Sequence, residues 1–511
     1  MITEYLMSDN VKNVLLEVYE GSQESIKERL EIMSYYSFYK GPCENEEDKQ
    51  YPHKRGQSWE LSKDLDFTPT QEIRNHTKKL LQKQQRFMFG QSPDILVKPY
   101  DNETTDNAEG LRQLIDDVLE DGEFWNETFK AFLDSTIGKR VLLLVEANPG
   151  MPIQYKYYTA NQFNYKLNPH NYKELDEVII AYQEPDTIGK PADEQIWHKW
   201  KYFMNGEACI LEKSQYNGNA KKLNEQVINT MLNEIPARVI VNGGLLGDIK
   251  GTSDIVDLMP IANSYNKRMS DLSDALRFKM FEQMVAIDAS ADSIDSIKIA
   301  PNALIDLKGD PSKPDSKPDL KMVSSQFTFV EAAQYYLDKA LADMYEILDQ
   351  PRPEDIKNVP SAKALKFIFY DLMARCEEKW KSWEPSILWA IRFTLDCIDK
   401  FNLYPDNEKR VYINTNARIS LNHNYPIPED EFEQKKTAML EVDHKVRSRK
   451  SYMRDYGTIE DENELFNEIL EEERELQNAT SDPFNTMMEN VNTTQEVSNT
   501  NPKEHENNKE E

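Results

Sequence analysis

Long hydrophobic runs are absent from this chain of 511 residues. No segment approaches the roughly 18 consecutive apolar residues of a transmembrane helix, which excludes a membrane-spanning protein of that type. The first residues, MITEYLMSDNVKN, lack the basic start and apolar core of a secretory signal. We therefore expect no contact with a membrane.

Cysteine is also scarce. The four cysteines, Cys43, Cys209, Cys376 and Cys397, lie far apart and show no CxxC spacing. This spacing predicts neither a zinc site nor a disulfide framework, and it fits a reducing, cytosolic environment.

Catalytic motifs are missing as well. A phosphate-binding loop would need glycine at Leu133 and serine or threonine at Arg140. The glycines between 243 and 251 do not have the dinucleotide-binding spacing, and the seven histidines include no HExxH. No GxSxG elbow occurs either. We therefore expect no catalytic residue, no metal, no cofactor and no enzymatic activity.

A basic excess is lacking too, because 61 Lys and Arg face 90 Asp and Glu, for a net charge of -29. This balance argues against a protein that wraps nucleic acid tightly, although nucleic acid can still slide past such a surface. Basic residues gather at 78–86, 267–279 and 445–454. Each cluster is interpreted either as a solvated helix face or as a phosphate or partner contact.

The first half of the chain predicts an α+β unit. Helical periodicity covers 11–41, 69–90 and 110–137. Short runs rich in Val, Ile, Tyr and Trp then predict antiparallel strands at 139–147, 153–160, 175–184, 195–204, 207–213 and 235–244.

The second half is mainly helical. Apolar stripes predict long helices at 251–281 and 329–349, joined by a small β element and a loop rich in proline and lysine. Pro260 places the start of the first helix near Asp257 or kinks it. The stripes either bury against neighbouring copies in a ring or form an ordinary helical core. Further elements are predicted at 361–401, 411–421, 428–442 and 458–477, followed by a polar, disordered tail.

The order of these features resembles the portal proteins of tailed bacteriophages, of the type found in siphophages of Gram-positive hosts. One block, EIPARVIVNGG followed by 251–281, is similar to the family pattern at Pro236, Asn242, Ser253, Asp254, Leu258, Asn266, Ser270, Asp271 and Asp274. PNALIDLKGD with the helix at 328–349, VPSAKALKFIFYDLMARCEEK and the segment 446–475 follow in family order. Ala362 departs from the family's usual glycine.

The resemblance implies a portal fold, α+β and mainly helical. It also implies a ring, usually of about twelve subunits, around a channel for double-stranded DNA. The implied regions are the wing (1–250), stem helices (251–281 and 327–348), clip (282–326), tunnel loop (349–361), wing helix (362–401), crown (402–475) and a disordered acidic, Asn-rich tail (476–511).

The resemblance also assigns site residues. The channel loop would use Gln350, Arg352, Glu354, Asp355, Lys357 and Asn358. The clip would dock its partners through Lys308, Lys313, Lys317 and Lys321. The ring interface of the stem would consist of Leu258, Tyr265, Met269, Leu272, Leu276, Leu337, Leu341 and Met344.

The implied function is a portal at one capsid vertex of the virion, assembled in the host cytoplasm. A terminase motor would package DNA through the ring, and the genome would later leave through it. The implied partners are other copies of the chain, the large terminase subunit, a head–tail adaptor, the major capsid and scaffolding proteins, and double-stranded DNA without sequence preference. The alternative is an acidic scaffold or adaptor of virion assembly that forms no channel.

Overall fold

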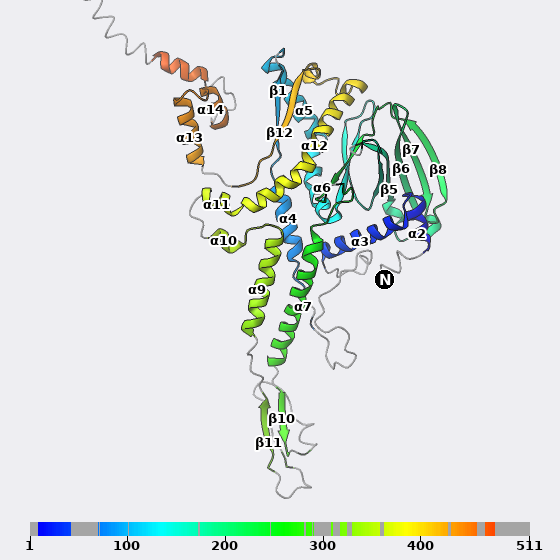
Figure 1. Cartoon of the computed structure of the whole chain (residues 1–511), viewed down its shortest axis with the longest axis vertical. Helices are drawn as coiled ribbons and strands as arrows, with labels where there is room; N and C mark the ends of the chain where they lie inside the picture. The colour runs from blue at the N-terminus through cyan, green and yellow to red at the C-terminus, as the bar shows by residue number, and fades with distance from the viewer. Residues whose placement is uncertain are drawn as a thin grey trace, which may run out of the picture. The chain divides into compact units, whose positions relative to one another are not determined.

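The computed structural model describes residues 9–41, 70, 72–100, 102–171, 174–245, 247–280, 283–288, 290, 308–309, 317–323, 330–357, 362–427, 431–456 and 466–475. The chain divides into two compact units, 1–426 and 427–511. Figure 1 shows the course of the chain and its elements. The predicted tail at 476–511 lies outside the described residues.

Helices and a two-stranded sheet open the first unit. The helices are α2 (Asp9–Glu17), α3 (Gln23–Lys40), α4 (His76–Phe89), α5 (Thr105–Asp121) and α6 (Phe124–Gly138). Strand β1 (Asp94–Pro99) pairs antiparallel with β12 (Ala417–Asn422). Residues 402–426, the start of the predicted crown, lie in the first unit, where β12 completes a sheet with β1.

Two of the predicted helices are each divided in the structure. The segment 11–41 breaks at Ser22, whose hydroxyl accepts the backbone N–H of Ser25 and caps α3. The segment 110–137 breaks at Gly122, where a Cβ would lie 2.5 Å from the Tyr155 ring. Glu123 then adopts a left-handed φ of 49°. Apolar periodicity continued across both breaks, so it concealed them.

Two antiparallel sheets form the β part of this unit. One has the order β3 (Gln154–Thr159), β2 (Arg140–Glu146), β9 (Ala237–Val241). The other has the order β4 (Phe163–Leu167), β5 (Leu175–Gln183), β6 (Ile196–Asn205), β7 (Ala208–Asn217), β8 (Lys222–Asn229). The prediction of antiparallel strands is confirmed, but β1, β4 and β8 were not predicted as strands.

The core of the first unit lies around the smaller sheet. Strand β2 is buried along almost its whole length. It packs near α6 and near α12 (Tyr370–Phe401), where the rings of Phe132 and Trp383 lie 5.8 Å apart. The helix predicted at 361–401 is divided at Phe369 into α11 (Ala362–Ile368) and α12, which continues through Pro385.

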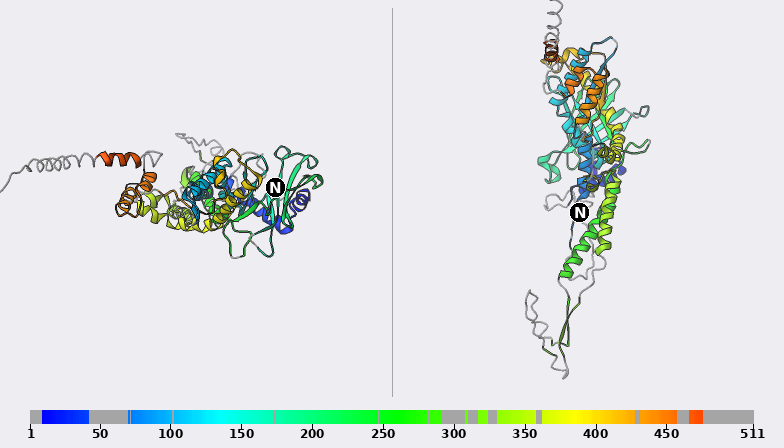
Figure 2. Two further views of the ribbon diagram at one scale, coloured as in Figure 1. Left: turned by 90° about the horizontal axis from the view of Figure 1, so that it is seen from above. Right: turned by 90° about the vertical axis from the view of Figure 1, so that its left-hand side faces the viewer.

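A pair of long helices completes the unit. Helix α7 (Ile255–Met280) contains Pro260, and α9 (Val330–Ile347) packs beside it; both views show the two helices side by side (Figures 1 and 2). Between them in the chain, β10 (Gln283–Ile287) pairs with β11 (Asp319–Val323). The predicted small β element is confirmed for these residues.

The second unit contains α13 (Glu431–Asp443) and α14 (Arg449–Tyr456), and residues 466–475 are helical. Among the described helices of the whole chain, none combines the length and the apolar character needed to span a membrane.

Candidate channel segment and the buried charge cluster behind it

The segment after α9 contains the residues predicted to line a channel. Asp349 ends the helix with a left-handed φ of 54°, and α10 (Pro353–Lys357) follows. The carboxylate of Asp355 accepts the backbone N–H of Arg352 at 3.1 Å and so fixes the start of this short helix. Arg352, Glu354, Asp355 and Lys357 are exposed, whereas Asn358 lies outside the described residues.

Gln350 differs from this group. Its side chain is only 5% exposed, and its amide nitrogen donates to the backbone oxygen of Leu80 in α4 at 2.8 Å. Within one chain Gln350 therefore anchors the segment to the body of the unit, and its predicted place at a channel stays a prediction.

Lys83 provides a second anchor from α4. Its ammonium group donates to the backbone oxygen of Pro351 at 2.9 Å and lies 5.7 Å from the centre of the Tyr345 ring. Burial, followed by the charge of Lys79, lowers the pKa of Lys83. At least one member of the basic cluster at 78–86 is thus a structural contact rather than a solvated charge.

Behind the segment lies a buried charge cluster, which we define as Asn242, Asp254, Arg375 and Lys379. The Lys379 ammonium donates to Asn242 Oδ1 at 2.6 Å and to Asp254 Oδ1 at 3.0 Å. Asn242 Nδ2 also donates to Asp254 Oδ1 at 3.0 Å. Arg375 lies 3.4 Å from Asp254.

The cluster joins three elements at one point. Asn242 follows β9, Asp254 precedes α7, and both cations come from α12. Arg375 also donates to the oxygen of Ile347 at 3.2 Å and to Asp349 at 3.1 Å, so it holds the end of α9 where the exposed segment begins. The cluster therefore fixes both long helices to α12.

Asp254 is the centre of this arrangement. Burial alone would raise the pKa of its carboxyl group, but Lys379, Arg375 and the hydrogen bond from Asn242 outweigh burial and hold the pKa below its ordinary value. The carboxylate is ionised near neutral pH and completes a buried ion pair.

A second constellation lies along α7. The backbone N–H groups of Thr70, Glu72 and Arg74 donate to Asp274, Ser270 and Asn266, at 3.0 to 3.1 Å. All three acceptors are buried. The motif residues Asn266, Ser270 and Asp274 thus hold Thr70, Glu72 and Arg74, which we call the strap, against the helix. Asp271 instead makes an exposed pair with Arg268.

The sequence analysis missed the cations of the buried charge cluster. Arg375 and Lys379 lie four residues apart in a helix with many other charges, so no pattern in the sequence distinguished them. Their acidic partner was visible, because Asp254 follows Ser253 directly before a striped helix. The hydroxyl of Ser253 accepts the N–H of Ile255, the first residue of α7, as expected for a residue that starts the helix.

The stripes of α7 and α9 were predicted as a ring interface. In the structure Leu258, Tyr265, Leu337 and Met344 are at most 8% exposed within a single chain. Met269, Leu272 and Leu341 pack against the same cluster. Within one chain these residues therefore belong to a helical core, and their assignment to a contact between copies stays a prediction. Only Leu276, 50% exposed, remains free of that core.

The predicted docking lysines are only partly described. Lys317 and Lys321 are exposed near and in β11, and Lys308 is exposed while its backbone oxygen accepts the N–H of Ser290. Lys313 lies outside the described residues.

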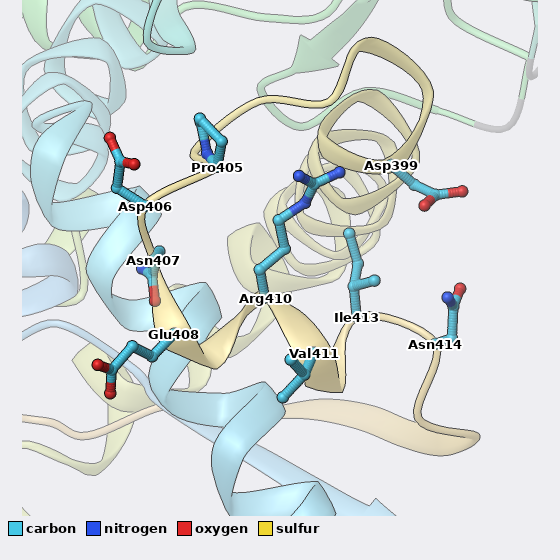
Figure 3. Close-up of a pocket in the computed structure, with 9 residues that line it drawn as sticks. All are labelled: Asp399, Pro405, Asp406, Asn407, Glu408, Arg410, Val411, Ile413 and Asn414. Carbon is cyan, nitrogen blue, oxygen red and sulfur yellow. The ribbon is translucent and has the colours of Figure 1, made fainter.

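A pocket of about 490 Å³ lies away from all of these residues (Figure 3). It is lined by Asp399, Pro405, Asp406, Asn407, Glu408, Arg410, Val411, Ile413 and Asn414. Across the described ranges, no group of three or more potential metal ligands comes together, here or elsewhere. Cys209, Cys376 and Cys397 are buried free thiols.

The fold and the site define an α+β protein with a paired-helix projection and a short anchored segment at its base. The chain matches the family model described as "Phage portal protein, SPP1 Gp6-like" over residues 17–479. It therefore belongs to this family of phage portal proteins, which confirms the portal resemblance.

Other comparisons add little to the family match. A chain from a structure titled "Virion of native gene transfer agent (GTA) particle" is 12% identical, with a TM-score of 0.34, over 74% of this chain and 87% of that chain. No curated protein matches this sequence.

Proposed function

We propose that copies of this chain form a closed ring at one capsid vertex, through which double-stranded DNA is packaged and later released. Membership of the portal family supports this proposal. The structural observation that carries it is the surface of the helix pair. With its apolar stripe buried inside the chain, the pair still exposes 74% of Tyr335 and 50% of Leu276.

Large exposed apolar side chains on a projecting helix pair favour contact with another copy. Tyr335 belongs to α9 and Leu276 to α7, so each helix offers one such side chain. When every copy presents one helix to its neighbour, the contact is heterologous, and such a contact gives a ring when the rotation between copies closes. We assign the ring contact of the stem to these two residues in place of the buried stripe.

Light scattering combined with negative-stain imaging of the same sample tests the ring. A closed ring of about twelve copies has a mass of about 700 kDa, since one chain has 59.6 kDa. We expect this mass and an axial hole. Particles of one or two chains that persist after scaffolding and capsid proteins are added would contradict the proposal.

The exposed residues Arg352, Glu354, Asp355 and Lys357 are proposed to face the passing DNA. Two cations and two anions give the segment no net charge, which avoids a deep binding minimum that would halt sliding. The anchors at Gln350 and Pro351 hold the segment at one end.

Replacing residues 352–357 by six alternating glycines and serines tests this role. The anchors stay intact, so we expect rings of normal mass that fail to package DNA in an assay with terminase and procapsids. Normal packaging by this variant would refute the assignment.

A terminase and a head–tail adaptor are the proposed partners of the β10–β11 region, where Lys317 and Lys321 are exposed.

A further inference from the structure

The sheet formed by β1 and β12 has one covered face and one open face. Ile95 and Leu421 lie opposite each other and are buried. On the other face, Lys98 stands directly opposite Arg418, and both side chains are exposed. We define the basic face as Lys98, Tyr100, Arg418 and Ser420.

This arrangement has an energetic cost. Like charges directly opposite each other in an antiparallel sheet are destabilising. Within the ranges that the structure describes, neither Lys98 nor Arg418 makes an ion pair. The chain has 90 acidic residues and a net charge of -29, so an uncompensated pair of opposed cations is unusual here.

The nearby acidic groups bond to amides rather than directly to the two cations. Asp94, on the same face, accepts a hydrogen bond from Asn424 at 2.7 Å. Glu103 accepts the backbone N–H of Asn416 at 3.3 Å and the side-chain amide of Asn107 at 3.1 Å. Both carboxylates therefore have other partners.

The basic face also carries Tyr100, whose hydroxyl can donate to phosphate oxygens. Tyr100 is 51% exposed and continues the ladder, because its N–H donates to the oxygen of Asn416 at 3.1 Å. Lysine, arginine and tyrosine are donors that proteins use for phosphate oxygens, whereas the Ser420 hydroxyl donates to the backbone oxygen of Leu96 at 3.5 Å. Opposed Cβ atoms lie about 5 Å apart, so the two cations can contact neighbouring phosphates of one strand.

We propose that the basic face binds the phosphate backbone of double-stranded DNA without reading its sequence. Strands β1 and β12 lie at the end of the first unit away from the α7–α9 pair (Figure 1). This inference deepens the proposed function: it identifies a surface outside the channel that touches the same DNA. It favours DNA over an acidic protein because opposed, exposed cations suit a regular row of phosphates.

Binding of preassembled, full-length rings to closed circular plasmid DNA tests the proposal. A closed circle cannot thread a closed ring, so binding reports surfaces outside the channel. The test variant is K98Q/R418Q. The matched control, K130Q/K166Q, removes two exposed lysines that are already paired with Glu127 and Glu177.

Removal of each cation that neutralises a phosphate should reduce the slope of log affinity against log salt by about 0.9. We expect K98Q/R418Q to bind at least about tenfold more weakly at low salt with a shallower slope, while the control retains wild-type binding. Wild-type affinity and slope in K98Q/R418Q would overturn the proposal. So would unchanged plasmid binding with reduced affinity for polyglutamate, which would identify an acidic protein as the ligand.

Two measurements separate this result from other failures. The melting temperature of K98Q/R418Q should equal or exceed that of the wild type, because the opposed charges are removed. Light scattering should give the wild-type mass. A ring that forms and packages DNA but binds plasmid unchanged would overturn only the basic face, whereas absence of the ring in the wild-type chain would contradict the proposed function itself.

Discussion

Asp254 illustrates how single residues hold this molecule together. The residue is 8% exposed, and its carboxylate contacts the side chains of Lys379, Arg375 and Asn242. A buried ion pair is weak evidence of net stabilisation, but removal of one partner leaves an uncompensated buried charge. Substitution at such a site therefore costs more free energy than the intact ion pair contributes.

We predict that Asp254→Asn lowers the free energy of unfolding by about 3 kcal/mol, because Lys379 and Arg375 lose their buried counter-charge. Denaturant unfolding measures this change. The matched control is Asp257→Asn, an exposed position in the first turn of the same helix, where we expect a loss below about 1 kcal/mol. Equal losses in the two variants would contradict a special role for the cluster.

The same carboxylate gives a direction of pH dependence. Its pKa is depressed in the folded state, so its stabilising contribution is present above the ordinary carboxyl range and is lost as the pH falls through the lower, folded value. The ionised carboxylate of Asp254 therefore stops stabilising the folded protein only at acidic pH.

Asp134 has the opposite behaviour. Burial raises its pKa to about 6, against a weaker lowering by the hydroxyl of Tyr36, which donates to Oδ1 at 3.1 Å. A raised carboxyl pKa means that stability is lost as the pH rises from about 4 to about 6. We predict that Asp134→Asn removes this loss and stabilises the protein by about 2 kcal/mol at pH 8.

Thermal unfolding of Asp134→Asn between pH 4 and pH 8 measures the effect. Asp121→Asn, an exposed position at the end of α5, is the control and should follow the wild-type profile. A wild-type pH profile in Asp134→Asn would show that the carboxyl group does not titrate in this range.

At the scale of elements, the contact between the strap and α7 requires the spacing of the donors along the strap to match the spacing of the acceptors along the helix. Acceptors four residues apart on α7 are spaced about 6 Å along the helix. Donors two residues apart in an extended chain are spaced about 6.6 Å. Asn266, Ser270 and Asp274 can therefore meet three successive alternate N–H groups, which explains their common four-residue spacing.

We predict that Asp274→Ala releases the start of the strap. The N–H of Thr70 loses its side-chain acceptor, so hydrogen exchange of the peptide covering 70–75 should accelerate about tenfold, with a stability loss of about 1–2 kcal/mol. Asp271→Ala, three residues earlier on the helix, removes only an exposed pair and should leave exchange unchanged. Acceleration in both variants would point to a general weakening of α7.

At the scale of the whole molecule, the exposed side chains of the helix pair decide assembly. We predict that Tyr335→Asp reduces the fraction of chains in rings at least tenfold, because a charge replaces the large apolar side chain of α9. Light scattering measures that fraction. Met151→Asp, at a 61% exposed position between β2 and β3, serves as the control. Normal ring formation by Tyr335→Asp would exclude this residue from the contact.

The sequence by itself determined the class of the fold and the family. Short runs rich in Val, Ile, Tyr and Trp identified β2, β3, β5, β6, β7 and β9. Apolar stripes at helical spacing identified α7 and α9, because local patterning reflects which face of an element is buried. The order of short motifs from Asn242 onward identified the portal family. These features are carried by residues close together in the chain.

Only the tertiary structure decided which surfaces the patterns serve. A stripe on α7 records burial but not the identity of its partner, and the partner proved to be α9 of the same chain. Likewise, β1 and β12 pair although more than 300 residues separate them, and Gln350 is buried by contact with Leu80. These contacts join segments that are far apart in the chain. They stabilise the protein only once it has folded, so the pattern of neighbouring residues does not reveal them.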